Sequence, residues 1–170
     1  SRGLGDVYKR QGYIWIATYN GLVRYDGYFT KIYHTESEST KKSIDGFINI
    51  IAEDNQSNLW IGTHNGLYKL NKKHETIEKI HLPNPQVSNV EAVTCTREGA
   101  IWAGTNKGLF IKKKDEKSFT LYKTTQNFDV KSLLEDKRGH IWIGTWSQGL
   151  FRYDPTQQLS LIHISEPTRP

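Results

Sequence analysis

The stretch that decides the fold is His140-Ile141-Trp142-Ile143-Gly144-Thr145, because close copies of it occur at three earlier places in the chain. The copies are Tyr13-Ile14-Trp15-Ile16-Ala17-Thr18, Asn58-Leu59-Trp60-Ile61-Gly62-Thr63 and Ala100-Ile101-Trp102-Ala103-Gly104-Thr105. Their tryptophans lie 45, 42 and 40 residues apart, and a Gly-Leu pair follows each copy. A fixed period of this length predicts a repeat architecture.

One repeat is long enough for four short strands. In the second copy, segments rich in β-branched and apolar residues cover about 48–53, 58–63, 66–70 and 77–82. Asn65-Gly66 suits a two-residue hairpin because asparagine and glycine tolerate positive φ, and Asn20-Gly21 offers the same pair in the first copy. Asp54 and Asp136 are placed to open turns by accepting hydrogen bonds from their own backbone, as aspartate often does. Four antiparallel strands in this length match one blade of a β-propeller.

The expected fold class is therefore all-β, a β-propeller fragment built from four-stranded antiparallel blades. We expect blades at about 12–33, 47–82, 89–123 and 130–154, with three strands in the first and the last and four in the others. These 14 strands are fewer than the roughly 16 of four complete blades, and the missing ones belong to different blades. The sequence thus predicts an arc of a larger ring.

The two ends of the chain depart from the repeat. Residues 1–11, which contain DVYKRQ, and 159–170, which end in LIHISEPTRP, resemble translated sequencing-adaptor text. We expect the repeats to occupy 12–158 and the two flanks to carry no function.

Composition and charge narrow the function classes. The chain is 36% hydrophobic and has no long uninterrupted apolar run, so no membrane span is expected within it. Its net charge of +5 comes from 23 basic and 18 acidic residues that are mixed along the chain, which does not indicate a nucleic-acid partner. Cys95 is the single cysteine, so no internal disulfide can form, and the six histidines lack metal-ligand spacing.

The repeat tryptophans have two interpretations. Their even placement, two residues before a small Gly or Ala, favours packing between neighbouring blades, where an indole buries a large area. Stacking on a ligand is the alternative. We expect the structural role for Trp15, Trp60, Trp102 and Trp142.

The paired carboxylates Glu53-Asp54 and Glu135-Asp136 raise the question of acid–base catalysis. Catalysis needs two carboxyls that converge on one bond, whereas these pairs recur blade by blade at the same turn. Turn capping is the expected role. Asp54 to Asn58 resembles a calcium loop only faintly, because the glycine and the distal glutamate are missing. We expect no catalytic residue, no metal site and no cofactor.

The hairpin tips between the second and third strands of each blade are the candidate ligand-binding residues. They vary from copy to copy on a constant scaffold, which is how loops often carry recognition. The fourth hairpin is one residue longer and places a fifth tryptophan there. The alternative is a generic exposed turn. The candidates are Tyr19, His64, Asn106 and Trp146.

These repeats resemble the two-component-regulator propeller repeat, and residues 135–145 match its pattern closely. In the second copy Ser57 replaces the usual glycine, and in the third Cys95-Thr96 replaces the acidic pair and Ala103 the usual isoleucine. The resemblance covers about 12–158.

The resemblance implies the periplasmic sensor region of a hybrid two-component histidine kinase, whose parent protein is membrane-anchored and dimeric. It implies an oligosaccharide ligand and contacts with adjoining domains of the parent, with phosphorelay activity elsewhere in it. Two alternatives remain: a propeller lyase or hydrolase of the streptogramin-lyase type, and a plain protein-interaction propeller.

Overall fold

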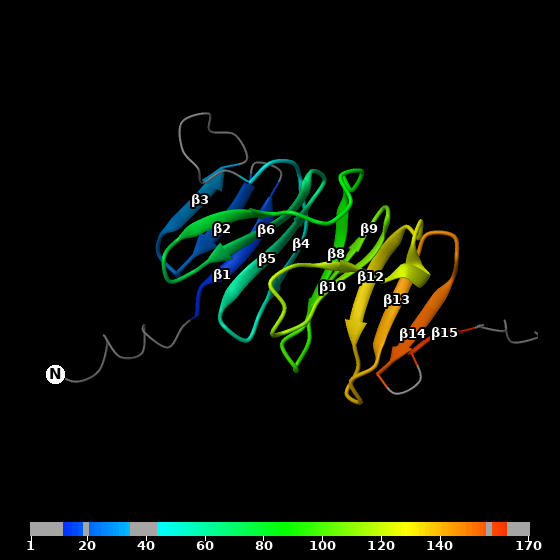
Figure 1. Ribbon diagram of the computed structural model, residues 1–170. Coiled ribbons are helices and arrows are strands. Elements are labelled where there is room, and N and C mark those ends of the chain that lie inside the picture. The colour runs from blue at the N-terminus through cyan, green and yellow to red at the C-terminus, as the bar shows by residue number, and fades with distance from the viewer. Residues whose placement is uncertain (1–11, 19–20, 35–43, 156–157, 163–170) are drawn as a thin grey trace, which may run out of the picture.

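The structure, a computed structural model, describes residues 12–18, 21–34, 44–155 and 158–162. Four antiparallel sheets stand side by side in an open row (Figure 1). The fold class expected from the repeats is confirmed. No helix among the described residues is long and apolar enough to cross a membrane.

The sheets follow one another in chain order, and within each sheet consecutive strands pair. The first sheet holds β1 (Ile14–Thr18), β2 (Gly21–Tyr25) and β3 (Thr30–His34). The second holds β4 (Ile48–Glu53), β5 (Asn58–Thr63), β6 (Gly66–Asn71) and β7 (Thr76–Ile80). The third holds β8 (Val90–Cys95), β9 (Ile101–Thr105), β10 (Gly108–Lys112) and β11 (Thr120–Leu121), followed by the 3₁₀ turn η1 (Lys123–Thr125). The fourth holds β12 (Val130–Glu135), β13 (Ile141–Thr145), β14 (Leu150–Asp154) and β15 (Gln158–Ile162).

The last sheet has one strand more than the sequence repeats predict. β15 pairs along β14 over five residue pairs, so the fourth sheet has four strands where three were expected. Strand pairing uses main-chain groups, which any sequence without proline supplies, so a segment that breaks the repeat can still complete the sheet. The adaptor origin of 159–170 stays a prediction.

Neighbouring sheets meet mainly along their first strands, β4, β8 and β12, which makes these the inner strands of the arc. Three apolar clusters fill the spaces between the sheets, one for each junction. The repeat glycine permits this approach: a Cβ on Gly62 would lie 2.8 Å from the backbone oxygen of Val90 in the next sheet. A Cβ on Gly104 would lie 2.5 Å from Val130 Cγ1. Any larger residue would push the sheets apart.

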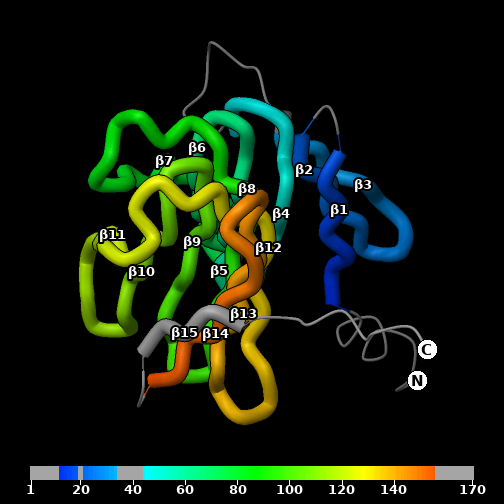
Figure 2. Tube along the Cα trace, turned by 90° about the vertical axis from the view of Figure 1, so that its right-hand side faces the viewer, coloured from blue at the N-terminus to red at the C-terminus, as the bar shows by residue number. Residues whose placement is uncertain are grey.

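The connections lie on two opposite edges of the row. The turns that join each inner strand to its neighbour lie on one edge, and the segments that lead directly into β4, β8 and β12 lie on the other (Figures 1 and 2). The hairpins between the second and third strands share the crossover edge, because their backbones bond to it, as described below. We call this edge the tip face and the opposite one the turn face.

The aspartate turns form as expected. Asp54 Oδ1 accepts hydrogen bonds from the backbone N–H groups of Gln56 and Asn58, both at 2.9 Å. The hairpins of the second and third sheets have two-residue loops, but the predicted loop pair Asn65-Gly66 is wrong: Gly66 pairs with Thr63, so the loop residues are His64 and Asn65. The positive φ is at Gly66, 129°, and not at Asn65. The Thr63 hydroxyl donates to the carbonyl of Gly66 at 3.1 Å and accepts from the N–H of Asn65 at 3.1 Å, which closes this loop.

Candidate functional site

The tip face is built by hairpins that are bonded to the crossovers. The backbone N–H of His64 donates to the carbonyl of Phe47 at 3.0 Å, and that of Trp146 donates to Asp129 at 2.8 Å. The N–H of Asn106 donates to Asn89 at 3.2 Å. Each tip is therefore fixed against the segment that enters the inner strand of its own sheet.

The repeat threonine closes each hairpin. The hydroxyl of Thr105 donates to the carbonyl of Gly108 at 2.8 Å and accepts from the N–H of Lys107 at 3.0 Å. The hydroxyl of Thr145 donates to Gly149 at 2.7 Å across a loop that is one residue longer. This threonine supports the loop whatever side chains the tip carries, so the tip residues are free to vary.

Each inner strand carries a β-bulge at the same place beside the tip face. The register shifts between Ile48 and Ile50 and at the equivalent positions in β8 and β12. The extra residues are Asn49, Glu91 and Lys131, each of them polar. Bulges often redirect side chains next to functional sites.

The redirected side chains form one hydrogen-bonded chain across three sheets, which we call the inner-strand network (Asn49, Asn89, Glu91, Asp129 and Lys131). Asn49 Nδ2 donates to Asn89 Oδ1 at 2.8 Å, and Asn89 Nδ2 donates to Glu91 Oε1 at 2.6 Å. Lys131 Nζ lies 2.6 Å from Glu91 Oε1 and 3.1 Å from Asp129 Oδ2. The network joins the second, third and fourth sheets.

Lys131 is the cation of this network. Burial alone would lower the pKa of Lys131, but the hydrogen bonds that its ammonium donates to Glu91 and Asp129 outweigh the effect of burial, and the pKa lies above its ordinary value. The ammonium stays charged at neutral pH and is held between two carboxylates, which leaves the group of three with one net negative charge. Lys131 Nζ also lies 5.5 Å from the centroid of the Trp146 ring, within cation–π range.

Trp146 is the exposed end of the network. Its side chain is 76% exposed, and Lys131 orients one side of the indole. Two acceptors are buried without a hydrogen-bond donor in the described part of the chain: Gln148 Oε1, in the same hairpin, and Oδ1 of Asp129, whose carbonyl accepts from the Trp146 N–H. Such acceptors are uncommon, and a bound donor is one way to satisfy them.

The other candidates from the sequence occupy different places. Asn106 contacts the network, because its Oδ1 accepts from the N–H of Asn89 at 3.4 Å. His64 is exposed at the second tip, and its imidazole makes no hydrogen bond within the described residues. Tyr19 lies outside the described residues. The structure thus brings Trp146 and Asn106 together through the network and leaves His64 apart.

The repeat tryptophans lie below this face and differ in burial. Trp60 and Trp102 are 3% and 5% exposed and belong to the clusters between the second and third and between the third and fourth sheets. Trp15 is half-buried beside Tyr33, with ring centroids 5.8 Å apart. Trp142, in the last sheet, is half-buried as well.

Sequence reasoning missed the network itself. Asn49, Glu91 and Lys131 each follow the first apolar residue of an inner strand, so an alignment of the repeats would show one variable polar position there. That signal was available. The hydrogen bonding between sheets could not be predicted, because no pattern in the amino-acid sequence indicates the bulge that redirects these side chains.

Comparison with known proteins agrees with the repeat pattern. The sequence model of the two-component regulator propeller family matches residues 42–65 and 125–147, which include Trp60 and Trp142 and most of their strands. Two segments of this chain are two-component regulator propeller repeats. No curated protein matches the chain.

Solved structures of related regulators have the same fold. The extracellular domain of the hybrid two-component system BT3049 from B. thetaiotaomicron is 26% identical with a TM-score of 0.74, over 89% of this chain and 22% of that one. The extracellular domain of the one-component system BT4673 from the same organism is 26% identical with a TM-score of 0.74, over 91% and 21%. The chain therefore spans about a fifth of these relatives.

Virginiamycin B lyase from Staphylococcus aureus is also similar, at 17% identity and a TM-score of 0.69, over 91% of this chain and 53% of that one. That likeness shows the fold alone. Within the described residues, no group of three or more His, Cys, Asp and Glu side chains is arranged to hold a metal ion.

Proposed function

We propose that this chain is part of the extracytoplasmic ligand-sensing region of a two-component signalling protein and is not itself catalytic. The propeller repeats and the resemblance to extracellular domains of two regulators support this proposal. A periplasmic location, a membrane-anchored dimeric parent, and contacts with its adjoining domains belong to the same proposal.

The ligand class that we propose is a glycan fragment bound at the tip face. The observation that carries it is Trp146, an indole that is 76% exposed on a backbone fixed to the crossover and beside a charged network. A sugar ring presents C–H groups that pack on an indole and hydroxyls that bond to carboxylate and ammonium groups. Trp146, Lys131 and Glu91 supply both kinds of contact.

The test is calorimetric titration of the full chain with cellotetraose, maltotetraose, xylotetraose and trigalacturonate. We expect one of these to bind and Trp146→Ala to weaken it by about 1–3 kcal/mol, the range of an aromatic anchor, or roughly 5- to 150-fold. Lys131→Met should weaken it too, because the indole loses its neighbour.

Phe29→Ala is the matched control. Phe29 is 78% exposed, in the turn between β2 and β3 on the opposite edge, so its loss should leave the affinity unchanged. Equal losses for Phe29→Ala and Trp146→Ala would contradict the proposed site. Failure of all four glycans to bind would contradict the ligand class, and binding of a peptide at Trp146 would favour a protein-interaction propeller instead.

A further inference from the structure

On the turn face, the second and fourth sheets have the same pattern of hydrogen bonds around the repeat tryptophan. Asp54 Oδ2 accepts from the Trp60 indole N–H at 2.9 Å, while Oδ1 accepts from the N–H of Gln56. Asp136 repeats this arrangement with Trp142 at 3.1 Å and with the N–H of Arg138 at 2.8 Å. One carboxylate therefore bridges an indole donor and a backbone donor.

The third sheet has the same donors without the carboxylate. Thr96 stands at the aspartate position, and its hydroxyl accepts from the N–H of Ala100 at 3.0 Å. The indole N–H of Trp102 and the backbone N–H of Glu98 make no hydrogen bond in the part of the chain that the structure describes. Trp102 is 5% exposed as a whole residue, but its indole nitrogen is not among the buried unpartnered atoms of the described chain, so a molecule in solution can reach this donor.

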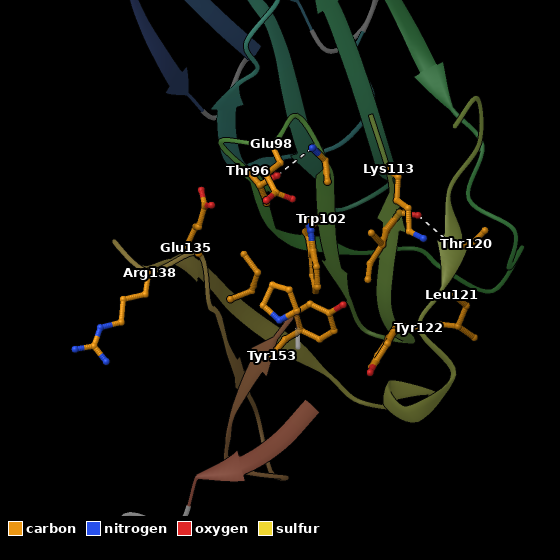
Figure 3. A pocket seen from close by; sticks show the side chains of 15 residues that line it. Thr96, Glu98, Trp102, Lys113, Thr120, Leu121, Tyr122, Glu135, Arg138 and Tyr153 are labelled. Carbon is orange, nitrogen blue, oxygen red and sulfur yellow. Dashed lines mark hydrogen bonds between the residues drawn. The ribbon is translucent and has the colours of Figure 1, made fainter. Parts of the chain in front are cut away.

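These donors face a pocket between the third and fourth sheets. It has a volume of about 460 Å³, and Trp102, Glu98 and Thr96 form part of its wall. Figure 3 shows the indole nitrogen at the end of the Trp102 ring that is nearer to Thr96 and Glu98. The pocket has the size and partly apolar lining that are typical of small-molecule sites.

The rest of the wall is mainly aromatic and aliphatic. The Tyr153 ring meets Trp102 edge-on at 5.0 Å and Tyr122 at 5.8 Å. Ile111 stands across the strand pair from Trp102, where the second sheet has Lys69 with its Nζ 5.6 Å from the Trp60 ring. The third sheet therefore lacks both the carboxylate and the lysine that flank Trp60.

We propose that this pocket binds a small organic carboxylate. Its carboxylate accepts from the Trp102 indole N–H and the Glu98 backbone N–H, in place of the missing aspartate. Its apolar body packs on Ile111, Tyr122 and Tyr153. The proposal concerns a second site, on the face opposite Trp146, and does not depend on the glycan proposal.

The charges around the pocket permit an anion. Lys113 supplies a positive charge and Glu98 a negative one, while the Arg138 side chain extends away from Trp102 (Figure 3). Arg97 bonds the Glu135 carboxylate, with its backbone N–H at 3.0 Å and its Nε at 3.5 Å. In the second sheet, burial alone would raise the pKa of Asp54, yet hydrogen bonds from Asn58, the Trp60 indole and two backbone N–H groups hold it below its ordinary value. The hydrogen-bond donors around this turn position thus favour a negatively charged acceptor.

The test follows the five indole N–H signals of the full chain by NMR during titration with benzoate, with Trp102→Phe to assign the Trp102 signal. We expect benzoate to move the Trp102 signal downfield in a saturable manner. Benzamide, a neutral molecule of the same shape, should bind at least tenfold more weakly, because it lacks the second carboxylate oxygen and the charge.

Thr96→Asp is the decisive variant, because it restores the side chain that two other sheets carry. We expect it to shift the Trp102 indole signal without ligand and to reduce benzoate affinity at least tenfold. Thr124→Asp adds the same charge at an exposed position of η1 and should leave the affinity within twofold. Should Thr96→Asp fail to fold, Trp102→Phe replaces it, with the same expected loss followed by calorimetry. An unmoved Trp102 signal, or equal benzoate binding by wild type and Thr96→Asp, would overturn the proposal.

Discussion

At the scale of single residues, the reactivity and the structural role of a side chain depend on its surroundings as well as on its type. Cys95 ends β8 in a partly buried position, and burial, together with the charges of Asp54 and Glu53, raises its pKa to about 12. Thiols react as thiolates, so we expect Cys95, the single cysteine of the chain, to react slowly in the folded protein.

We expect Cys95 to react with Ellman's reagent at pH 8 at least about 100-fold more slowly in the folded chain than in guanidinium, where the thiol pKa returns to about 8.5. The absorbance of the released thiolate measures both rates. Similar rates in the two conditions would show that Cys95 is exposed and ionised.

Trp60 and Trp146 show the same contrast between two residues of one type. Trp60→Ala should cost about 3–5 kcal/mol of unfolding free energy, because it empties a packed space between two sheets and removes the partner of Asp54. Trp146→Ala should stay within about 0.5 kcal/mol, as is usual for exposed positions. Denaturant titration of both variants measures this, and comparable losses would contradict the assigned roles.

At the scale of elements, the turn that follows the inner strand of the second, third and fourth sheets contains a left-handed residue, and an aspartate opens this turn in the second and fourth sheets. The left-handed position has φ of 84° at Gly139 and 89° at Gly99, and Ser57 is forced to 62° in the second sheet. A residue with a Cβ is strained there, whereas glycine is not.

Ser57→Gly should therefore raise the unfolding free energy by about 0.5–1 kcal/mol, the relief of strain less the added freedom of the unfolded chain. Gly139→Ala is the reverse change and should lower it by about 1 kcal/mol. Thermal and denaturant unfolding of both variants give the signs. Destabilisation by Ser57→Gly would mean that the serine side chain, and not the backbone, matters in this turn.

The same turn predicts a pH dependence. The pKa of Asp54 is below its ordinary value in the folded chain, so its ionised form stabilises the fold above the unfolded pKa of about 3.9, and this is lost as pH falls through the folded pKa. Asp54→Asn should cost roughly 1–3 kcal/mol at pH 7, the range of hydrogen bonds to a charged group, and less at pH 3. Urea titrations at both pH values measure the two differences, and a cost that does not change with pH would contradict this role of the carboxylate.

The strands and turns could be predicted well from the amino-acid sequence, because the residues that determine them are close together in the chain. The aspartate turns and the strands around each repeat tryptophan follow from residues close together in the chain. Three features could not be predicted, because each depends on a neighbouring strand or sheet. They are the backbone conformation of Asn65, the inner-strand network at Lys131, and the N–H donors at Trp102 that lack a hydrogen-bond acceptor. The replacement of aspartate by Thr96 was visible, but its consequence for Trp102 needed the geometry of the other two sheets.

At the scale of the whole molecule, four sheets in an open row leave apolar side chains uncovered at both ends. Ile14 and Ile16 in the first sheet are 57% and 45% exposed, and Leu134 in the last sheet is 65% exposed. In a closed propeller such side chains would pack against a further blade, as the clusters between the inner sheets do. That this row is an arc of a larger ring stays a prediction.

The two edges of the row divide the functions that we propose. The tip face carries Trp146 and the inner-strand network, which joins three sheets. The turn face carries the pocket at Trp102.

The central claim, that ligand binds at Trp146, is tested most directly by the indole N–H signals of the full chain during titration with the four glycans named above. The chain has five tryptophans, so each gives one signal and Trp146→Phe assigns the one that matters. We predict that one glycan moves the Trp146 signal in a saturable manner and leaves those of Trp15, Trp60 and Trp142 in place. A glycan that binds but moves only other indole signals, or a Trp146 signal that none of the four glycans moves, would contradict the claim.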